Sequence, residues 1–117
     1  MKGIPSFTNL TKKRINTADF GRIYKKLLSG WELSVVFAGS ALMKNLNKKY
    51  RNKNKVANVL SFLLDKKSGE IFLNSNEKKL PHLFAHACLH LLGYGHKTDD
   101  EAQKMEKLEQ KILNSKS

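Results

Sequence analysis

The sequence predicts a small α+β domain in which a central mixed sheet is packed by helices. Two observations lead to this prediction. The chain has 117 residues, a length that suits one domain with one modest core. Segments with apolar residues at the helical period alternate with short segments rich in β-preferring residues. The chain contains no internal repeat, low-complexity tract or Gly/Ser-rich linker. We therefore expect a single domain over residues 1–117.

The N-terminal half predicts a helix, a strand and a second helix. The first helix runs from Thr17, a residue suited to capping, to about Leu28, and Ser29-Gly30 ends it. Trp31 to Ala38 predicts a strand because it is rich in valine and phenylalanine. A second helix begins at Gly39-Ser40. The residues spaced for burial on it are Leu42, Met43, Leu46 and Tyr50.

The C-terminal half predicts two strands and two helices. The strands are Val56 to Leu64 and Glu70 to Asn74, joined by a turn around Lys67-Ser68-Gly69. Pro81 suits the first turn of a third helix, which runs to about Leu92 and stops at Gly93. Thr98 and Glu101 form a capping box for the final helix. Its predicted apolar side consists of Ala102, Met105, Leu108, Ile112 and Leu113.

The charge of the chain is strongly positive and unevenly distributed. Lysine and arginine total 22 against 10 acidic residues, and residues 1–60 hold 13 basic and 2 acidic side chains. This asymmetry favours a polyanionic partner such as nucleic acid or an anionic membrane, although a generally lysine-rich surface explains it equally well. No apolar run approaches the roughly 18 residues of a membrane span, and we expect neither a span nor a secretory signal. The single cysteine suits a cytoplasmic location.

Three of the four histidines predict a metal site at the end of the third helix. A separation of four residues turns a helix by about 400°, so His86 and His90 project from one face. Gly93 then breaks the helix, and the chain can return His96 from another direction. Three imidazoles with one open position are typical of catalytic zinc. We therefore predict one Zn²⁺ per chain, bound by His86, His90 and His96.

The other candidate ligands fit this site less well. Cys88 lies two residues from each helical histidine and points roughly 200° away from them, so we interpret it as a core residue. His82 lies one turn upstream on the histidine face and is predicted to be a supporting or solvent-facing residue. The ligand spacing matches the H-E-x-x-H-x-x-G-x-x-H pattern of metzincin proteases. Ala87, however, stands where those proteases need a glutamate, which argues against peptide hydrolysis.

The segment His86-Ala-Cys-Leu-His-Leu-Leu-Gly-Tyr-Gly-His96 resembles the H-G-x-L-H-L-x-G-Y-D-H signature of the YbeY family of bacterial endoribonucleases and rRNA maturation factors. Other segments are similar to this family in the same order and cover about residues 31–113. They are Leu46-Asn-Lys-Lys-Tyr-Arg51, Asn58-Val-Leu-Ser-Phe62, Gly69-Glu-Ile71 and the final helix from Asp99 to Glu109. The departures are Ala57, Leu63, Glu70 and Ala87, a short segment between residues 63 and 69, and Gly95 in place of an aspartate.

This resemblance implies a zinc-dependent, single-strand-specific endoribonuclease. It would act in 16S rRNA 3′-end maturation, ribosome biogenesis and ribosome quality control. His90 and Arg51 would be catalytic residues, with Arg51 near the metal, where its guanidinium would bind a phosphate. RNA would be the substrate, and the ribosome or small-subunit proteins would be partners. The basic residues expected to bind RNA are Lys48, Lys49, Arg51, Lys53 and Lys55.

The alternative is an assembly factor that does not catalyse a reaction and binds rRNA and ribosomal protein, with zinc holding its fold. The basic N-terminal half suits both functions. Three histidines with an open position favour the enzyme. Gly95 and the lack of a carboxylate base in the motif favour the binding protein. In the enzyme, the nucleophile would be a zinc-activated water or the ribose 2′-OH, and the sequence leaves both open. A hydrolase of some other substrate is a third possibility, because zinc proteases share the histidine spacing.

Overall fold

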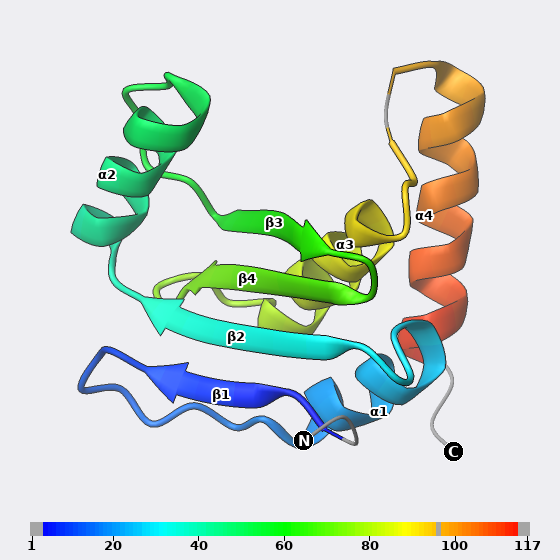
Figure 1. Cartoon of the computed structure of the whole chain (residues 1–117), viewed down its shortest axis with the longest axis horizontal. Helices are drawn as coiled ribbons and strands as arrows, with labels where there is room; N and C mark the ends of the chain where they lie inside the picture. Colours follow the sequence, from blue (N-terminus) through cyan, green and yellow to red (C-terminus); the bar gives the residue numbers. More distant parts are fainter. Residues whose placement is uncertain (1–3, 96, 115–117) are drawn as a thin grey trace.

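The protein is described by a computed structural model, which covers residues 4–95 and 97–114. Four strands and four helices follow one another within these residues (Figure 1). In chain order they are β1 (Ser6–Asn9), α1 (Ala18–Leu27), β2 (Glu32–Ala38), α2 (Ser40–Arg51), β3 (Val59–Asp65), β4 (Ser68–Asn74), α3 (Leu80–Leu91) and α4 (Asp99–Asn114).

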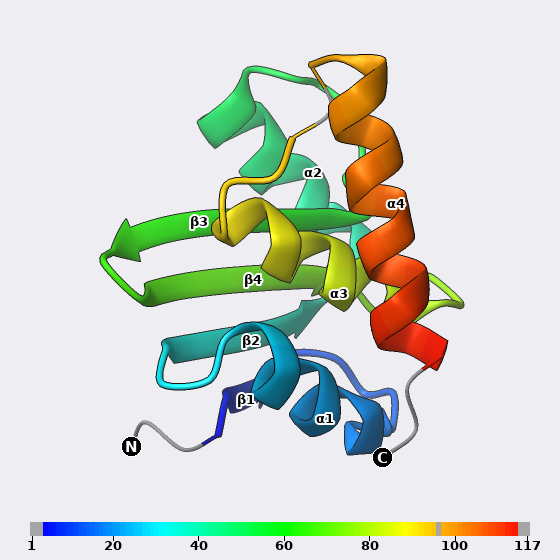
Figure 2. The same cartoon turned by 90° about the vertical axis from the view of Figure 1, so that its right-hand side faces the viewer.

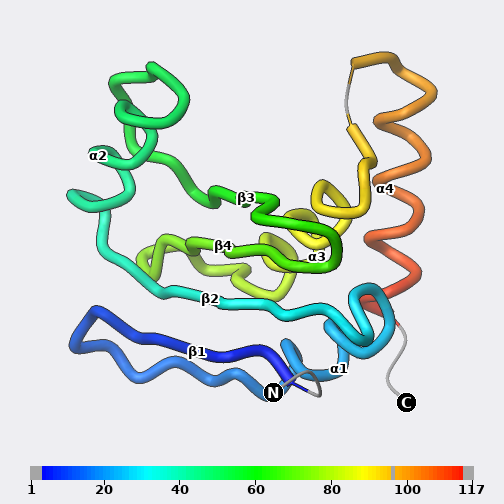
Figure 3. Tube along the Cα trace, viewed as in Figure 1, coloured from blue at the N-terminus to red at the C-terminus, as the bar shows by residue number. Residues whose placement is uncertain are grey.

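The strands form one mixed sheet in the order β1-β2-β4-β3. β1, β2 and β4 are parallel, and β3 pairs antiparallel with β4. In this register Val35 of β2 lies between Phe7 of β1 and Ile71 of β4. β3 therefore forms one edge of the sheet, and its path between α2 and α4 can be followed in Figure 3. The predicted α+β class with a mixed sheet is confirmed.

Helices cover the two faces of the sheet unequally. α1, α3 and α4 pack on one face, where they enclose the larger core (Figure 2). Fully buried side chains of that core include Phe20, Ile23, Phe37, Ile71 and Phe84. α2 covers part of the other face through Met43 and Leu46, which pack on Leu60 and Phe72. Within residues 4–95 and 97–114, no helix is both long enough and apolar enough to cross a membrane.

The predicted strands are correct in place, but one strand was missed. β3 begins three residues later than predicted, and β4 begins at Ser68, two residues earlier. The reversal between them is consequently tight, and Lys67 adopts a left-handed φ of 53°. β1 was not predicted at all, because it has only four residues and one aromatic side chain. That side chain, Phe7, packs beside Phe37, with 6.3 Å between ring centroids.

The helix predictions hold except in three details. Thr17 occupies the N-cap position of α1, but its side chain makes no capping hydrogen bond. Asn16 Oδ1 instead accepts a hydrogen bond from the Ala18 backbone N–H at 3.0 Å. On α2, Tyr50 was predicted to be buried but is 56% exposed, and Leu42 is 36% exposed. α2 extends beyond the edge of its small core, so its last turn is not covered.

Gly69 lets α3 pack closely against the sheet. A Cβ atom at this position would lie 3.0 Å from Leu91 Cδ1 and 3.3 Å from the Phe62 carbonyl oxygen. These contacts are closer than an ordinary van der Waals contact, so an added side chain would require the Leu91 side chain and the Phe62 carbonyl to shift by a few tenths of an ångström. The absence of a side chain at residue 69 therefore leaves room for Leu91, at the C-terminal end of α3, to pack against β4.

Candidate metal centre

Two of the three predicted ligands meet at the end of α3. Pro81 stands in the first turn of this helix, and Gly93, at a φ of 102°, follows its last turn. His86 and His90 lie one turn apart, as predicted. The distance from His86 Nε2 to His90 Nε2 is 3.0 Å. The two imidazoles therefore direct the same ring atom toward one point.

In both imidazoles the other ring nitrogen, Nδ1, makes a hydrogen bond that fixes the orientation of the ring. His86 Nδ1 is hydrogen-bonded to Glu109 Oε1, which α4 contributes, and His90 Nδ1 lies 3.0 Å from the Tyr94 carbonyl oxygen. An ionised carboxylate and a carbonyl only accept hydrogen bonds, so both Nδ1 atoms are the donors. In neutral imidazoles, the lone pairs then remain on both Nε2 atoms. Two lone pairs facing each other at this distance repel, unless one ring carries a second proton and donates it to the other or a metal cation lies between them.

This donor set fits a zinc ion. Zinc binds imidazole nitrogen at about 2.0–2.1 Å with tetrahedral angles, which places two ligand nitrogens about 3.3 Å apart. Metal-bound histidines commonly donate their second N–H to a carboxylate or a backbone carbonyl, as His86 and His90 do here. Residues 4–95 and 97–114 contain no group of three His, Cys, Asp or Glu side chains placed to hold a metal. The predicted third ligand, His96, lies outside the described residues.

A carboxylate lies beside Gly95 and Lys97, although Gly95 itself has none. Glu101 Oε2 accepts a hydrogen bond from the Lys97 backbone N–H at 3.1 Å. The same oxygen would lie 3.7 Å from a Cβ atom added to Gly95. Half of the predicted capping box is formed, since the Glu101 N–H donates to Thr98 Oγ1 at 3.1 Å, while the Glu101 carboxylate bonds the N–H of Lys97, one residue before the cap. Glu101 thus takes part in the N-terminal cap of α4 and places a carboxylate next to Gly95.

The interpretation of Cys88 as a core residue is confirmed. Its side chain is fully buried, and burial raises the pKa of the thiol, so it stays protonated and is a poor metal ligand. His82 is exposed at the beginning of α3, which agrees with its predicted role as a solvent-facing residue. It lines a surface pocket with Lys78, Lys79 and Leu83.

A second group of predicted site residues lies around the end of α2. Arg51, Lys53 and Lys55 line one pocket of about 270 Å³ together with Asn47 and neighbouring residues. Asn47 is only 3% exposed, and its Nδ2 donates a hydrogen bond to the Lys55 carbonyl oxygen at 3.0 Å. This contact holds the loop after α2 against the helix. The structure therefore brings three cationic side chains to one concave place.

The two groups are carried by different elements. α2, which carries Arg51, and α4, which carries Glu109, stand at opposite ends of this edge strand (Figure 1). Lys48 and Lys49 belong to the last turn of α2, and both are exposed. The sequence placed Arg51 near the metal by resemblance alone. In the structure, it is grouped with Lys53 and Lys55.

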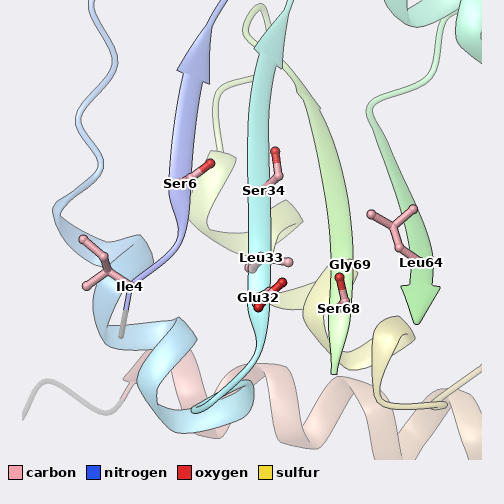
Figure 4. Close-up of a pocket in the computed structure, with 8 residues that line it drawn as sticks. All are labelled: Ile4, Ser6, Glu32, Leu33, Ser34, Leu64, Ser68 and Gly69. Carbon is pink, nitrogen blue, oxygen red and sulfur yellow. The ribbon is translucent and has the colours of Figure 1, made fainter. Parts of the chain in front are cut away.

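A further pocket, of about 330 Å³, lies over the ends of the strands on the face that α2 leaves open (Figure 4). Its lining consists mainly of hydroxyl and apolar side chains together with one carboxylate. None of the predicted metal-binding or RNA-binding residues is among the described residues that line it. Those residues are Ile4, Ser6, Glu32, Leu33, Ser34, Leu64, Ser68 and Gly69.

Sequence reasoning missed the supporting residues Glu109 and Asn47. Glu109 is separated from His86 by 23 residues, so only the docking of α4 on α3 reveals the contact. One signal was present: Glu109 follows the buried Met105 by four residues, on the inward side of an amphipathic helix. Asn47 stood among apolar positions of the second helix, which is unusual for an amide without a partner.

Comparisons with known proteins show which family this chain resembles. A family model described as Endoribonuclease YbeY matches residues 5–74 and 66–117. A protein named Endoribonuclease YbeY from Thermodesulfovibrio yellowstonii is 45% identical, with 71% of this chain and 65% of the relative covered. A relative of the same name from Bartonella bacilliformis is 39% identical, with 70% and 66% covered. The chain thus spans about two thirds of the length of these relatives.

Two more distant comparisons extend over more of the chain. The Endoribonuclease YbeY of Bartonella henselae is 33% identical, with 93% of this chain and 82% of the relative covered. The solution structure of a Thermotoga maritima protein superimposes with a TM-score of 0.53 at 19% identity and covers 94% of this chain and 89% of that one. This last likeness concerns the fold alone.

Proposed function

Because the chain belongs to the YbeY endoribonuclease family, we propose that it is a metal-dependent endoribonuclease that cleaves single-stranded RNA. The observation that carries this proposal is the convergence of His86 Nε2 and His90 Nε2 at 3.0 Å, with both Nδ1 atoms engaged as donors. Such a pair is preorganised for a cation. The cationic pocket around Arg51 supplies the complementary feature, a place for phosphate.

His86 and His90 would hold zinc together with His96, leaving one position open. When bound, zinc supplies Lewis acidity toward a phosphoryl oxygen and lowers the pKa of a water molecule. Glu109 and the Tyr94 carbonyl hold the two imidazoles in the tautomer that presents Nε2. His90 is therefore proposed to be both a metal ligand and a catalytic residue. Either a water or the ribose 2′-OH can serve as nucleophile in this arrangement.

Arg51 is proposed to bind a phosphate of the RNA. A guanidinium forms two parallel hydrogen bonds to phosphate oxygens and stabilises the charge that develops during cleavage. Lys53 and Lys55 line the same pocket and Lys48 and Lys49 precede it on α2, so these lysines extend the binding surface along the backbone. The RNA would then cross the edge of the sheet at β3 between this pocket and the histidine pair.

Membership of this family also supports a proposal for the cellular substrate, the partners and the location of the protein. We propose that the substrate is rRNA, with a role in 16S rRNA 3′-end maturation, ribosome biogenesis and quality control. The ribosome or its small-subunit proteins would be partners, and the cytoplasm would be the location. One observation favours the second candidate, an assembly factor that does not catalyse a reaction: neither Ala87 nor Gly95 offers the motif a carboxylate.

Removing the metal tests the proposed activity. We expect the purified chain to cleave a single-stranded RNA, to lose this activity after treatment with a chelator, and to regain it when zinc is restored. The measurement is the rate of product formation on a denaturing gel. Cleavage that continues unchanged after chelation would contradict a metal-dependent mechanism. RNA binding without any cleavage would favour the assembly factor.

Glu109 offers a test of the metal site that does not depend on activity. Glu109→Ala removes the acceptor of the His86 Nδ1–H, and the ring can then rotate or change tautomer. We expect zinc affinity to fall about 10- to 100-fold. The measurement is competition for zinc against a chelator of known affinity. Glu106→Ala, on an exposed part of the same helix, removes an equal charge and should keep wild-type affinity. Equal affinity in the two variants would show that Glu109 does not support a metal.

A further inference from the structure

The last turn of α2 carries an exposed aromatic ring among cationic side chains. Tyr50 is 56% exposed, although its spacing on the helix had predicted burial. It precedes Arg51, and both lie one turn beyond Asn47, at i+3 and i+4. Because Asn47 and Arg51 line the cationic pocket, Tyr50 projects from the part of the helix that adjoins this pocket.

The ring is supported from the sheet. Its centroid lies 5.3 Å from that of Phe62 at an interplanar angle of 65°, and Phe62 in turn lies 5.9 Å from Phe72 at 82°. Phe62 and Phe72 belong to the small core beneath α2. Tyr50 therefore contacts the sheet on the protein side while more than half of the residue's surface remains exposed to solvent. An aromatic ring held in this way does not have to be ordered when it stacks on a ligand.

The positive charges around the Tyr50 ring indicate which kind of ligand this surface can bind. Between Glu32 and Asp65, the sequence has six basic residues and no acidic one. Lys49 Nζ lies 5.3 Å from the centroid of the Tyr50 ring, and Arg51, Lys53 and Lys55 line the neighbouring pocket. A ligand for this surface must combine a polyanionic backbone with a flat, apolar face. Single-stranded RNA has both, whereas duplex RNA keeps its bases stacked inside.

We propose that Tyr50 is a stacking platform for an unpaired RNA base, and that it contributes to the preference for single strands. This inference rests on the proposed function, since it takes RNA as the substrate. The phosphate beside the stacked base would enter the pocket of Arg51, Lys53 and Lys55. The base and the phosphate of one nucleotide would thus be bound by neighbouring side chains of α2 and the loop that follows it.

Binding measurements on three RNAs test the proposal. The full chain, as purified, is mixed at low temperature with a labelled single strand, with the same strand in a duplex, and with a strand of equal length that lacks bases. Anisotropy gives the affinities, and a gel confirms that each RNA stays intact. We expect Tyr50→Leu to weaken binding of the ordinary single strand about tenfold or more. Its affinity for the duplex and for the strand without bases should equal that of the wild type.

Tyr50→Phe is the matched control, because it keeps the ring and removes only the hydroxyl. It should bind the single strand as the wild type does. The proposal is wrong if Tyr50→Leu keeps wild-type affinity for the ordinary strand, if it weakens binding of all three RNAs equally, or if Tyr50→Phe is as weak as Tyr50→Leu. If the wild-type chain binds no RNA, the proposed function fails as well. Intact binding and cleavage by Tyr50→Leu would overturn only the stacking role.

Discussion

His90→Ala is expected to abolish metal binding. The substitution removes one of the two nitrogens that converge at 3.0 Å and leaves His86 Nε2 without its neighbour. A three-histidine site that loses a ligand from its preorganised pair no longer offers zinc the geometry it requires. We expect the metal content to fall from about one zinc per chain to near zero, as measured by elemental analysis of purified protein and by zinc titration.

His82→Ala is the matched control for this experiment. His82 lies on the same helix and is exposed, outside the convergent pair. The substitution removes one imidazole and leaves all the proposed ligands in place, so the metal content should stay near that of the wild type. Wild-type protein that contains no metal and binds none on titration would refute the metal centre. Equal losses in the two variants would indicate that zinc binds non-specifically to histidines.

Arg51→Ala is expected to separate cleavage from metal binding. Arg51 lines the pocket formed after α2, and neither His86 nor His90 is among the described residues that line this pocket, so the metal content should remain unchanged. The loss of a bidentate phosphate contact should lower the cleavage rate about 100- to 1,000-fold. The measurement is single-turnover cleavage of a single-stranded RNA by metal-loaded protein.

Two further variants show whether the effect comes from geometry or from charge alone. Arg51→Lys keeps the charge but loses the planar fork, and we expect it to recover only part of the rate. Lys44→Ala removes one positive charge from an exposed position of α2 that does not line the pocket. It should reduce the rate only slightly. If Arg51→Ala cleaves as fast as Lys44→Ala, the phosphate role assigned to Arg51 is wrong.

The sequence predicted an element correctly where residues within or next to that element mark its beginning and its end. α3 was predicted nearly to the residue because Pro81 suits its first turn and Gly93 its stop. The alignment of His86 with His90 also follows from helical geometry alone. β1 could not be predicted in the same way, since four residues with one aromatic side chain form a strand only by pairing with β2. That pairing joins segments about 28 residues apart.

Two features could not be predicted from the sequence, because each depends on how one helix packs against another element. Glu109 reaches His86 only because α4 packs against α3. The spacing of Tyr50 is that of a buried residue, yet its exposure is decided by how far the small core under α2 extends. The third proposed ligand, His96, lies outside the described residues, so its part in the site remains a prediction from spacing and resemblance.

The central claim is that this chain cleaves RNA with a metal held by its histidines. The most direct measurement compares the cleavage of single-stranded rRNA fragments by wild-type and His90→Ala proteins purified in the same way. We predict cleavage by the wild type and none by the variant. Equal activity in both preparations would contradict the claim, because it would show that the activity does not depend on the metal ligand and comes from a contaminating nuclease.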